Sequence, residues 1–196
     1  MTTISTIRER LRKPSVQKNK KLSIGLARKA VKITERSDLT EWFMSRYTLA
    51  QFLLRRANGA DFNSAIKLML IVRKRISRNE HPKMWADTSL ILARAYECKR
   101  NGDLKSAIAE YLSAMRFYSK DSYPDLWAMI KYHLATIYSL CEQGRRLDNI
   151  DEAIKNYKDA LEVLSAEKNS EAHKDIQDAL AELEREQKAT ILVNGK

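Results

Sequence analysis

Three histidines and two cysteines are the residues of this sequence whose types could bind a metal or activate a nucleophile. Zinc sites take such residues at short, characteristic spacings. His81, His133 and His173 are far apart, and neither Cys98 nor Cys141 stands at a metal-ligand spacing from any of them. The sequence therefore predicts no metal site, and ordinary helix-end positions are the favoured interpretation for His81 and His173.

Catalytic motifs are also missing from the sequence. It contains no HExxH segment and no nucleophile elbow. Three of its five glycines, Gly59, Gly102 and Gly144, recur at equivalent positions along the chain, and the other two cannot build a glycine-rich phosphate-binding loop. We expect a protein that is not an enzyme and that uses no cofactor and no metal.

Three tryptophans recur at nearly equal intervals and divide the chain into repeats. Trp42, Trp85 and Trp127 stand 43 and 42 residues apart. Each is followed at matching offsets by an alanine, by one of the three glycines and by an alanine-isoleucine pair: Ala50, Ala93 and Ala135, then Ala65-Ile66, Ala107-Ile108 and Ala153-Ile154. A period between about 20 and 50 residues is typical of a solenoid. With only 5 glycines and 3 prolines, the chain is predicted to be all-α.

Each repeat is expected to consist of two antiparallel helices. Pro82 stands where the first turn of a helix accepts proline. The second helix of each repeat is expected to begin at a cap four residues before its alanine: Asp61, Asp103 and Asn149. Alanines at the helix crossings let two backbones approach closely while Trp and Tyr fill the space beside them. The tryptophans are therefore interpreted as packing residues.

Three segments are expected along the chain. Residues 1–21 form a basic N-terminal segment, a short helix followed by a polar linker over 14–21. Residues 22–187 form one repeat domain, and residues 188–196 form a C-terminal tail. The leading helix of the repeat domain is expected to bury one face, made of Leu22, Leu26, Ala30 and Ile33.

The second repeat reads Leu92-Ala93-x2-Tyr96 and then Ala107-x3-Tyr111-x2-Ala114. The pattern resembles the tetratricopeptide repeat (TPR), although the period of 42–43 residues exceeds the usual period of about 34 residues. This long form is similar to the TPR arrays that accompany CHAT-type protease domains in bacteria. The resemblance implies a right-handed α-solenoid of stacked helix pairs, with about three full repeats and a partial repeat at each end. It identifies no partner, because TPR arrays serve many.

The resemblance also implies that the first helix of each repeat lines a concave groove. Its exposed positions correspond to Met44, Tyr47, Gln51, Leu54 and Arg55; to Asp87, Leu90, Arg94, Glu97 and Cys98; and to Met129, Tyr132, Thr136, Ser139 and Leu140. Methionine, tyrosine and arginine suit adaptable protein recognition. The leading hypothesis is therefore a non-catalytic scaffold or adaptor that binds a protein or peptide partner.

Charge is unevenly distributed along the sequence. Counting Lys and Arg against Asp and Glu, the net charge is +8 over residues 1–38, +7 over 39–100 and −4 over 101–196. An acidic protein partner fits the basic half, and so does nucleic acid, whose phosphates basic clusters attract. The residues for this nucleic-acid alternative are Arg8, Arg10, Arg12, Lys13, Lys18, Lys20, Lys21, Arg73, Lys74, Arg75 and Arg78. Solvated faces that only keep the protein soluble are the third interpretation of the same charge.

Two further expectations concern the setting of the protein. Two cysteines in 196 residues do not make a disulfide framework, so reduced thiols in a cytoplasmic protein are expected. No apolar run of about 18 residues is present to span a membrane. Association into a homo-oligomer through an exposed helix face is an alternative function.

Overall fold

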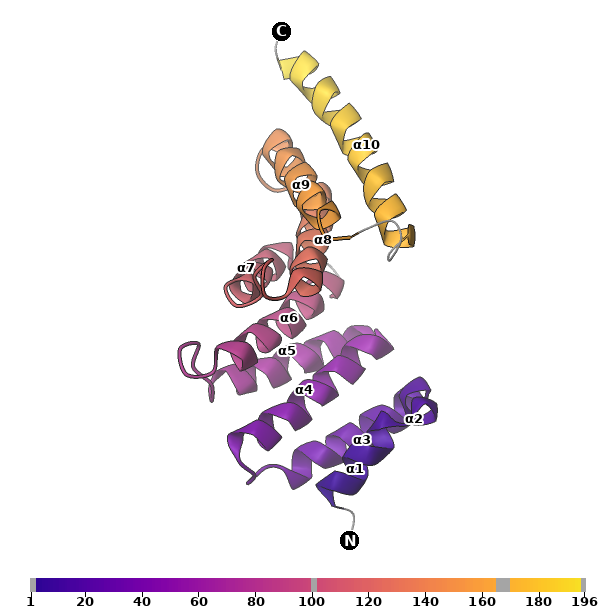
Figure 1. Cartoon of the computed structure of the whole chain (residues 1–196), viewed down its shortest axis with the longest axis vertical. Helices are drawn as coiled ribbons and strands as arrows, with labels where there is room; N and C mark the ends of the chain where they lie inside the picture. The colour runs from indigo at the N-terminus through magenta and orange to yellow at the C-terminus, as the bar shows by residue number, and fades with distance from the viewer. Residues whose placement is uncertain (1–2, 100–101, 165–169, 195–196) are drawn as a thin grey trace. The chain divides into compact units, whose positions relative to one another are not determined.

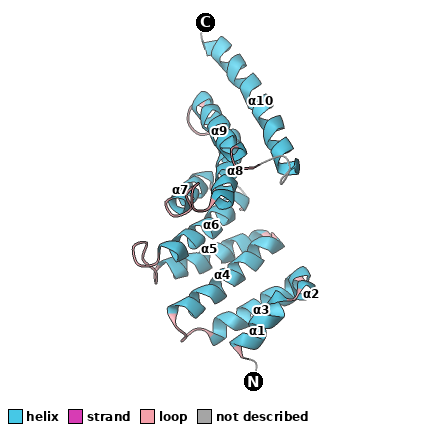
Figure 2. Cartoon of the chain, in the orientation of Figure 1, coloured by secondary structure: helices cyan, strands magenta, loops and turns pink. Residues whose placement is uncertain are grey.

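The computed structural model describes residues 3–99, 102–164 and 170–194. Every regular element in these ranges is an α-helix, which confirms the all-α prediction (Figures 1 and 2). The helices are α1 (Ile4–Arg12), α2 (Pro14–Lys18), α3 (Lys20–Ile33), α4 (Leu39–Arg56), α5 (Gly59–Arg73), α6 (Pro82–Cys98), α7 (Leu104–Met115), α8 (Pro124–Leu140), α9 (Arg146–Leu161) and α10 (Ser170–Asn194).

The chain divides into two compact units, residues 1–114 and residues 115–196, called unit 1 and unit 2 below. The boundary falls at the end of α7, inside the stretch that the sequence assigns to one repeat domain. In unit 1, α3 packs on α4, α4 on α5 and α5 on α6 (Figure 1). In unit 2, α8 packs on α9 and α9 on α10. Neighbouring helices in the sequence are therefore neighbours in space within each unit.

Unit 1 begins with helices where the sequence predicts one helix and a linker. Residues 14–18 form α2, with Pro14 in its first turn and Val16 buried. Asn19 then accepts a hydrogen bond from the Leu22 backbone N–H at 3.0 Å and so caps α3. The linker prediction is therefore wrong for most of residues 14–21, because one buried valine and one side-chain cap are enough to hold two short helical segments together.

The buried face of α3 differs from the predicted one. Ile24 and Ala27 are 2% and 0% exposed, whereas Leu22 and Ile33 are 38% and 41% exposed. Leu26 and Ala30 are buried as predicted. The helix is therefore rotated so that Ile24 and Ala27 are buried, and two leucine-sized side chains of the predicted face are exposed.

The small residues of the repeat lie in the cores, as predicted. Ala50, Ala65, Ala93, Ala107, Ala135 and Ala153 are all fully buried. In unit 1 they are surrounded by large residues such as Phe43, Met69 and Leu92. In unit 2, Ala135 and Ala153 share a core with Ile150 and Ile176. Because alanine carries only a methyl group, these positions let helices approach closely.

Only one of the three predicted helix caps, Asp103, caps its helix in the structure. Asp103 accepts a hydrogen bond from the Ser106 backbone N–H at 3.0 Å, as predicted. Asp61 and Asn149 are not caps, because α5 and α9 begin earlier, at Gly59 and Arg146. Asn58 caps α5 instead, by accepting from the Ala60 N–H at 3.2 Å.

Asp61 and Asn149 lie inside their helices and form hydrogen bonds with residues that precede those helices. Asp61 is 2% exposed and accepts two hydrogen bonds from the Arg56 guanidinium. Asn149 is 9% exposed and donates to the carbonyl oxygens of Cys141 and Gln143, at 3.0 and 2.8 Å. Each residue therefore fixes the loop that precedes its helix.

The last helix extends into the segment that the sequence predicts to be a tail. α10 continues to Asn194, and residues 195 and 196 lie outside the described part of the chain. Ile176 and Leu183 anchor α10 on unit 2, and the Glu186 carboxylate accepts from Arg146 of α9 at 2.7 and 2.8 Å. Ile191 and Leu192, near the end of the helix, are 53% and 72% exposed.

Candidate partner-binding site

The residues predicted to face a groove from α4 do share one face of that helix. Met44, Tyr47, Gln51 and Arg55 are separated by three, four and four residues, which places them on a single stripe. Gln51 and Arg55 are exposed, Tyr47 is half-buried, and Met44 is 43% exposed. We call these four residues the α4 face. Leu54, the neighbouring candidate, packs against the core of unit 1, and so does Tyr47.

The corresponding residues of α6 are more enclosed. Asp87 and Leu90 are buried, Arg94 and Glu97 are half-buried, and only Cys98 is exposed. α6 contacts both α4 and α5. In unit 1, the solvent-accessible part of the predicted site is therefore centred on α4.

A polar cluster joins the two helices beneath the α4 face. Lys83 donates to the Asp87 carboxylate at 2.9 Å across one turn of α6. Burial, and then the negative charge of Asp87, raises the pKa of Tyr47 to about 12, against a hydrogen bond with Gln51 that lowers it. Tyr47 is thus neutral at physiological pH. A neutral phenol beside a carboxylate can recognise a ligand by hydrogen bonding, but it is a poor base or nucleophile.

The far end of α6 is fixed by a second tyrosine. The Tyr111 hydroxyl, on α7, donates to the Glu97 carboxylate at 2.7 Å, and Tyr111 itself is fully buried. Burial, followed by the charge of Glu97, raises the pKa of Tyr111 well above its ordinary value. Desolvation and Glu97 also raise the pKa of the Cys98 thiol. A raised pKa leaves less thiolate, so Cys98 lacks the activation of a nucleophilic cysteine.

The candidates on α8 belong to unit 2 and are involved in its internal packing. The Thr136 hydroxyl lies 3.2 Å from the Tyr157 hydroxyl of α9, and it also donates to the Tyr132 carbonyl at 3.0 Å. The rings of Tyr132 and Tyr157 are 6.0 Å apart. Met129 and Ser139 are half-buried, and Leu140 is 67% exposed. Tyr132 and Thr136 therefore stabilise the α8–α9 pair before they contact any ligand.

Each repeat tryptophan carries two cationic side chains, a feature that the sequence analysis missed. On Trp42, the charged groups of Arg46 and Arg75 lie 4.1 and 4.7 Å from the ring centre. On Trp85, those of Arg73 and Arg78 lie at 4.3 and 5.3 Å. On Trp127, those of Lys120 and Lys131 both lie at 5.4 Å. Arg46 and Lys131 both stand four residues after their tryptophan, so helical spacing could have identified them. The interaction contributes about 0.5–2 kcal/mol for the enclosed cations Arg46 and Arg73, whose side chains are 4% and 21% exposed.

The candidates for nucleic-acid binding fall into two groups. Arg73 makes a bidentate ion pair with Glu110 at 3.0 and 2.7 Å and donates to Ser89, with its side chain 21% exposed. Arg8 pairs with Glu41 at 3.1 Å. The other candidates are exposed: Arg10, Arg12, Lys13, Lys18, Lys20, Lys21, Lys74, Arg75 and Arg78. Of these, Arg75 and Arg78 stack on tryptophans. Arg73 is therefore a structural residue that joins α5, α6 and α7.

The described residues contain neither a metal-binding cluster nor a membrane-spanning helix. Within residues 3–99, 102–164 and 170–194, no three His, Cys, Asp or Glu side chains come together as a metal site requires. In the same ranges, no helix has both the length and the apolar character needed to cross a bilayer.

Comparisons of the chain with protein-family models, with curated proteins and with solved structures found no match. The resemblance to TPR arrays therefore rests on the repeat positions themselves. The candidate site has to be judged by its geometry.

Proposed function

We propose that this chain is a non-catalytic helical-repeat module that binds a protein or peptide partner through the first helices of its repeats. The finer fold that we propose with it is a TPR-like, right-handed array, and the setting is the cytoplasm. The partner is a protein with an acidic patch, in keeping with the positive charge of residues 1–100.

The observation that carries this proposal is the α4 face. Its four side chains form a continuous stripe on a helix whose opposite side is fixed in the core by Trp42, Leu49 and Leu53. Met44 offers an adaptable apolar contact, and Arg55 offers a charged one. Beneath them, the Tyr47 phenol and the Gln51 amide supply hydrogen-bonding groups on a rigid helix. Such a combination suits recognition more than chemistry, because no activated acid, base or nucleophile accompanies it.

Variants of matched exposure can test the proposal. Met44 on α4 and Leu70 on α5 are both 43% exposed, so a charge at either should be tolerated by the fold. Partners would be captured from native cells with the wild-type chain, with Met44→Glu and with Leu70→Glu, and then quantified by mass spectrometry. We expect the first variant to lose a partner that the second retains. Equal recovery with all three chains would contradict the proposal.

Nucleic-acid binding remains the alternative, supported by the exposed basic residues of α1 to α3. Phosphate contacts make affinity fall steeply with salt. A gel-shift assay with duplex and single-stranded probes at low salt would detect it, and replacing Arg10, Arg12 and Lys13 by alanine should weaken the shift. An unshifted probe at low salt would remove this alternative.

A further inference from the structure

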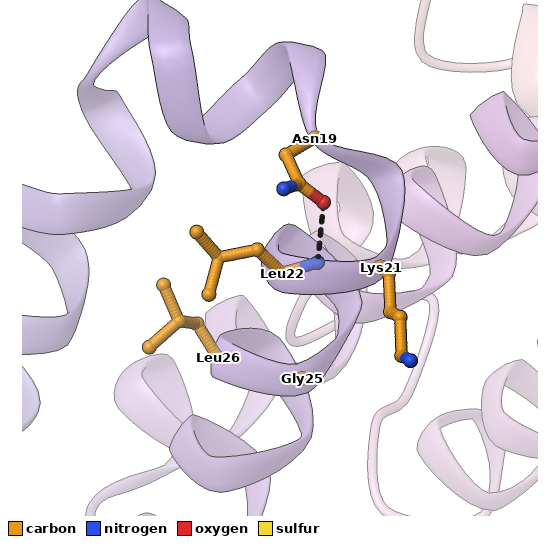
Figure 3. Close-up of a pocket in the computed structure, with 5 residues that line it drawn as sticks. All are labelled: Asn19, Lys21, Leu22, Gly25 and Leu26. Atoms are coloured by element: carbon orange, nitrogen blue, oxygen red, sulfur yellow. Dashed lines mark hydrogen bonds between the residues drawn. The ribbon is translucent and has the colours of Figure 1, made fainter.

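A hollow on the surface of unit 1 has no role in the proposed α4 site. It lies at the start of α3, has a volume of about 380 Å³ and is lined by Asn19, Lys21, Leu22, Gly25 and Leu26 (Figure 3). In Figure 3 the side chains of Leu22 and Leu26 extend to one side and Lys21 to the other, with Gly25 between them. Ligand pockets run from about 300 to 1,000 Å³, so this hollow suits one or two side chains of a partner.

Gly25 keeps this hollow open without any structural need for glycine. It lies in the interior of α3, where glycine is less stable than alanine. Its φ is not in the left-handed region, so the backbone does not require glycine. A Cβ built at this position would meet no atom within 4 Å, so packing does not require it either. What the missing side chain provides is space above the two leucines.

The apolar part of the hollow adjoins exposed apolar side chains on one face of α3. Leu22 is 38% exposed, and Ile33, eleven residues further along and hence on the same face, is 41% exposed. Leu26 is 7% exposed and forms the base between them. Exposed apolar residues that line up on one face next to a concavity are typical of a docking surface.

The surroundings of the hollow are strongly basic. Lys18, Lys20 and Lys21 are exposed at its edge, and Arg28 and Lys32 are exposed further along α3. Residues 1–38 contain three carboxylates, of which Glu35 is paired with Arg46. A ligand with negative charge around an apolar group would therefore be complementary to both parts of the surface.

We propose that the hollow docks an acidic peptide segment of a partner protein, which inserts one apolar side chain beside Leu22 and Leu26 and directs its carboxylates to the lysines. Nucleic acid fits less well, because no aromatic ring lines the hollow for a base to stack on. A flat anionic lipid surface would leave the concavity unfilled. This docking site is separate from the α4 face and does not depend on the function proposed for it.

A selection from a random peptide library on the full-length protein tests this site. The enriched peptides should be acidic and contain a Leu, Ile, Phe or Met. Their Kd should rise by at least about tenfold on Gly25→Ile, which fills the hollow with a side chain that keeps one rotamer in a helix. Lys21→Glu should weaken the same peptides. Lys67→Glu, the same charge change at an exposed position on α5, should not.

Three results would overturn the proposal. The first is a selection that yields no acidic peptides. The second is a peptide affinity that survives Gly25→Ile, or falls equally with Lys21→Glu and Lys67→Glu, since a general charge effect would then explain the binding. The third is cosedimentation with phosphatidylserine vesicles that Gly25→Ile abolishes while no peptide is enriched, since the surface would then bind membranes. Circular dichroism of each variant, with Gly25→Ala as the reference, verifies that the fold is retained.

Discussion

Unit 1 and unit 2 use the same repeat positions in different ways. Trp42 of unit 1 is 3% exposed and lies in the core between two arginines, whereas Trp127 of unit 2 is half-buried and carries two lysines. The cations differ in their partners too. Buried Arg46 pairs with Glu35, while Lys120 and Lys131 pair with Glu162 and Asp159.

The repeat pattern therefore predicts where a residue lies in its helix, but not how much it contributes to the free energy of unfolding. A tryptophan that closes a core and one that covers a helix pair occupy the same place in the sequence pattern. The cost of removing each depends on the neighbours that the pattern does not specify. Four predictions test this contrast.

The largest contrast is expected between the two tryptophans. Trp42→Ala should lower the free energy of unfolding by about 3–5 kcal/mol, because a buried aromatic side chain leaves a cavity. Trp127→Ala should cost about 1–2 kcal/mol, because its ring is half in water already. Urea unfolding followed by circular dichroism measures both. Trp42→Phe is the control, since the Trp42 indole N–H has no hydrogen-bond partner among the described residues. Equal losses for the two alanine variants would remove the contrast.

The loop-fixing residues should differ in the opposite direction. Asn149→Ala in unit 2 should cost about 1–3 kcal/mol, since two loop carbonyls lose their donor. Asp61→Ala in unit 1 should cost about 1 kcal/mol, because the Arg56 side chain is 34% exposed and can return to water. The same unfolding experiment compares them. A greater loss for Asp61→Ala would show that its burial matters more than its partner's hydration.

Acid should weaken both units through ion-paired carboxylates. Hydrogen bonds from Arg56 hold the pKa of Asp61 below its ordinary value, and those from Arg146 do the same for Glu186. A depressed folded pKa means that the contribution is complete above the unfolded value, about 3.9 for Asp, and is lost as the pH falls through the folded value. The difference in unfolding free energy between wild type and Asp61→Asn should therefore be constant from neutral pH to about 5 and shrink below about 4. Glu186→Gln should behave likewise; a difference that grows on acidification would reverse the sign.

The smallest effects are expected at two glycines. Gly144, before α9, has a φ of +85°, so Gly144→Ala should cost about 1 kcal/mol. Gly25 lies inside α3 with open space around it, so Gly25→Ala should add about 0.5–1 kcal/mol of stability. Thermal unfolding of the two variants should give shifts of opposite sign. A destabilised Gly25→Ala would mean that the helix needs glycine there for a reason that its surroundings do not reveal.

Much of the helical architecture could be predicted from the sequence, because period and small residues report on packing directly. Pro82 and Pro124 do begin α6 and α8, and the repeat alanines are buried. The rotation of α3 could not be predicted, since Leu22 and Ile24 both fit a helical period and only the contacts with α1, α2 and α4 select between them. The predicted caps at Asp61 and Asn149 are wrong because α5 and α9 begin earlier, at Gly59 and Arg146, so that both residues lie inside their helices.

The sequence predicts which candidate residues share a face of their helix, but not how exposed they are. Helical spacing places Met44, Tyr47 and Arg55 on one face, and the structure agrees. The same spacing cannot show that Asp87 and Leu90, the corresponding residues of α6, are buried. Lys83 as the partner of Asp87 follows from i, i+4 spacing and could have been found from the sequence.

The most direct test of the proposed function is hydrogen–deuterium exchange of the full chain, alone and saturated with a captured protein partner. The proposal predicts slower exchange of the α4 amides between Met44 and Arg55, with little change in α5. Protection confined to α5 or α7, with α4 exchanging as in the free chain, would contradict recognition through the first helices.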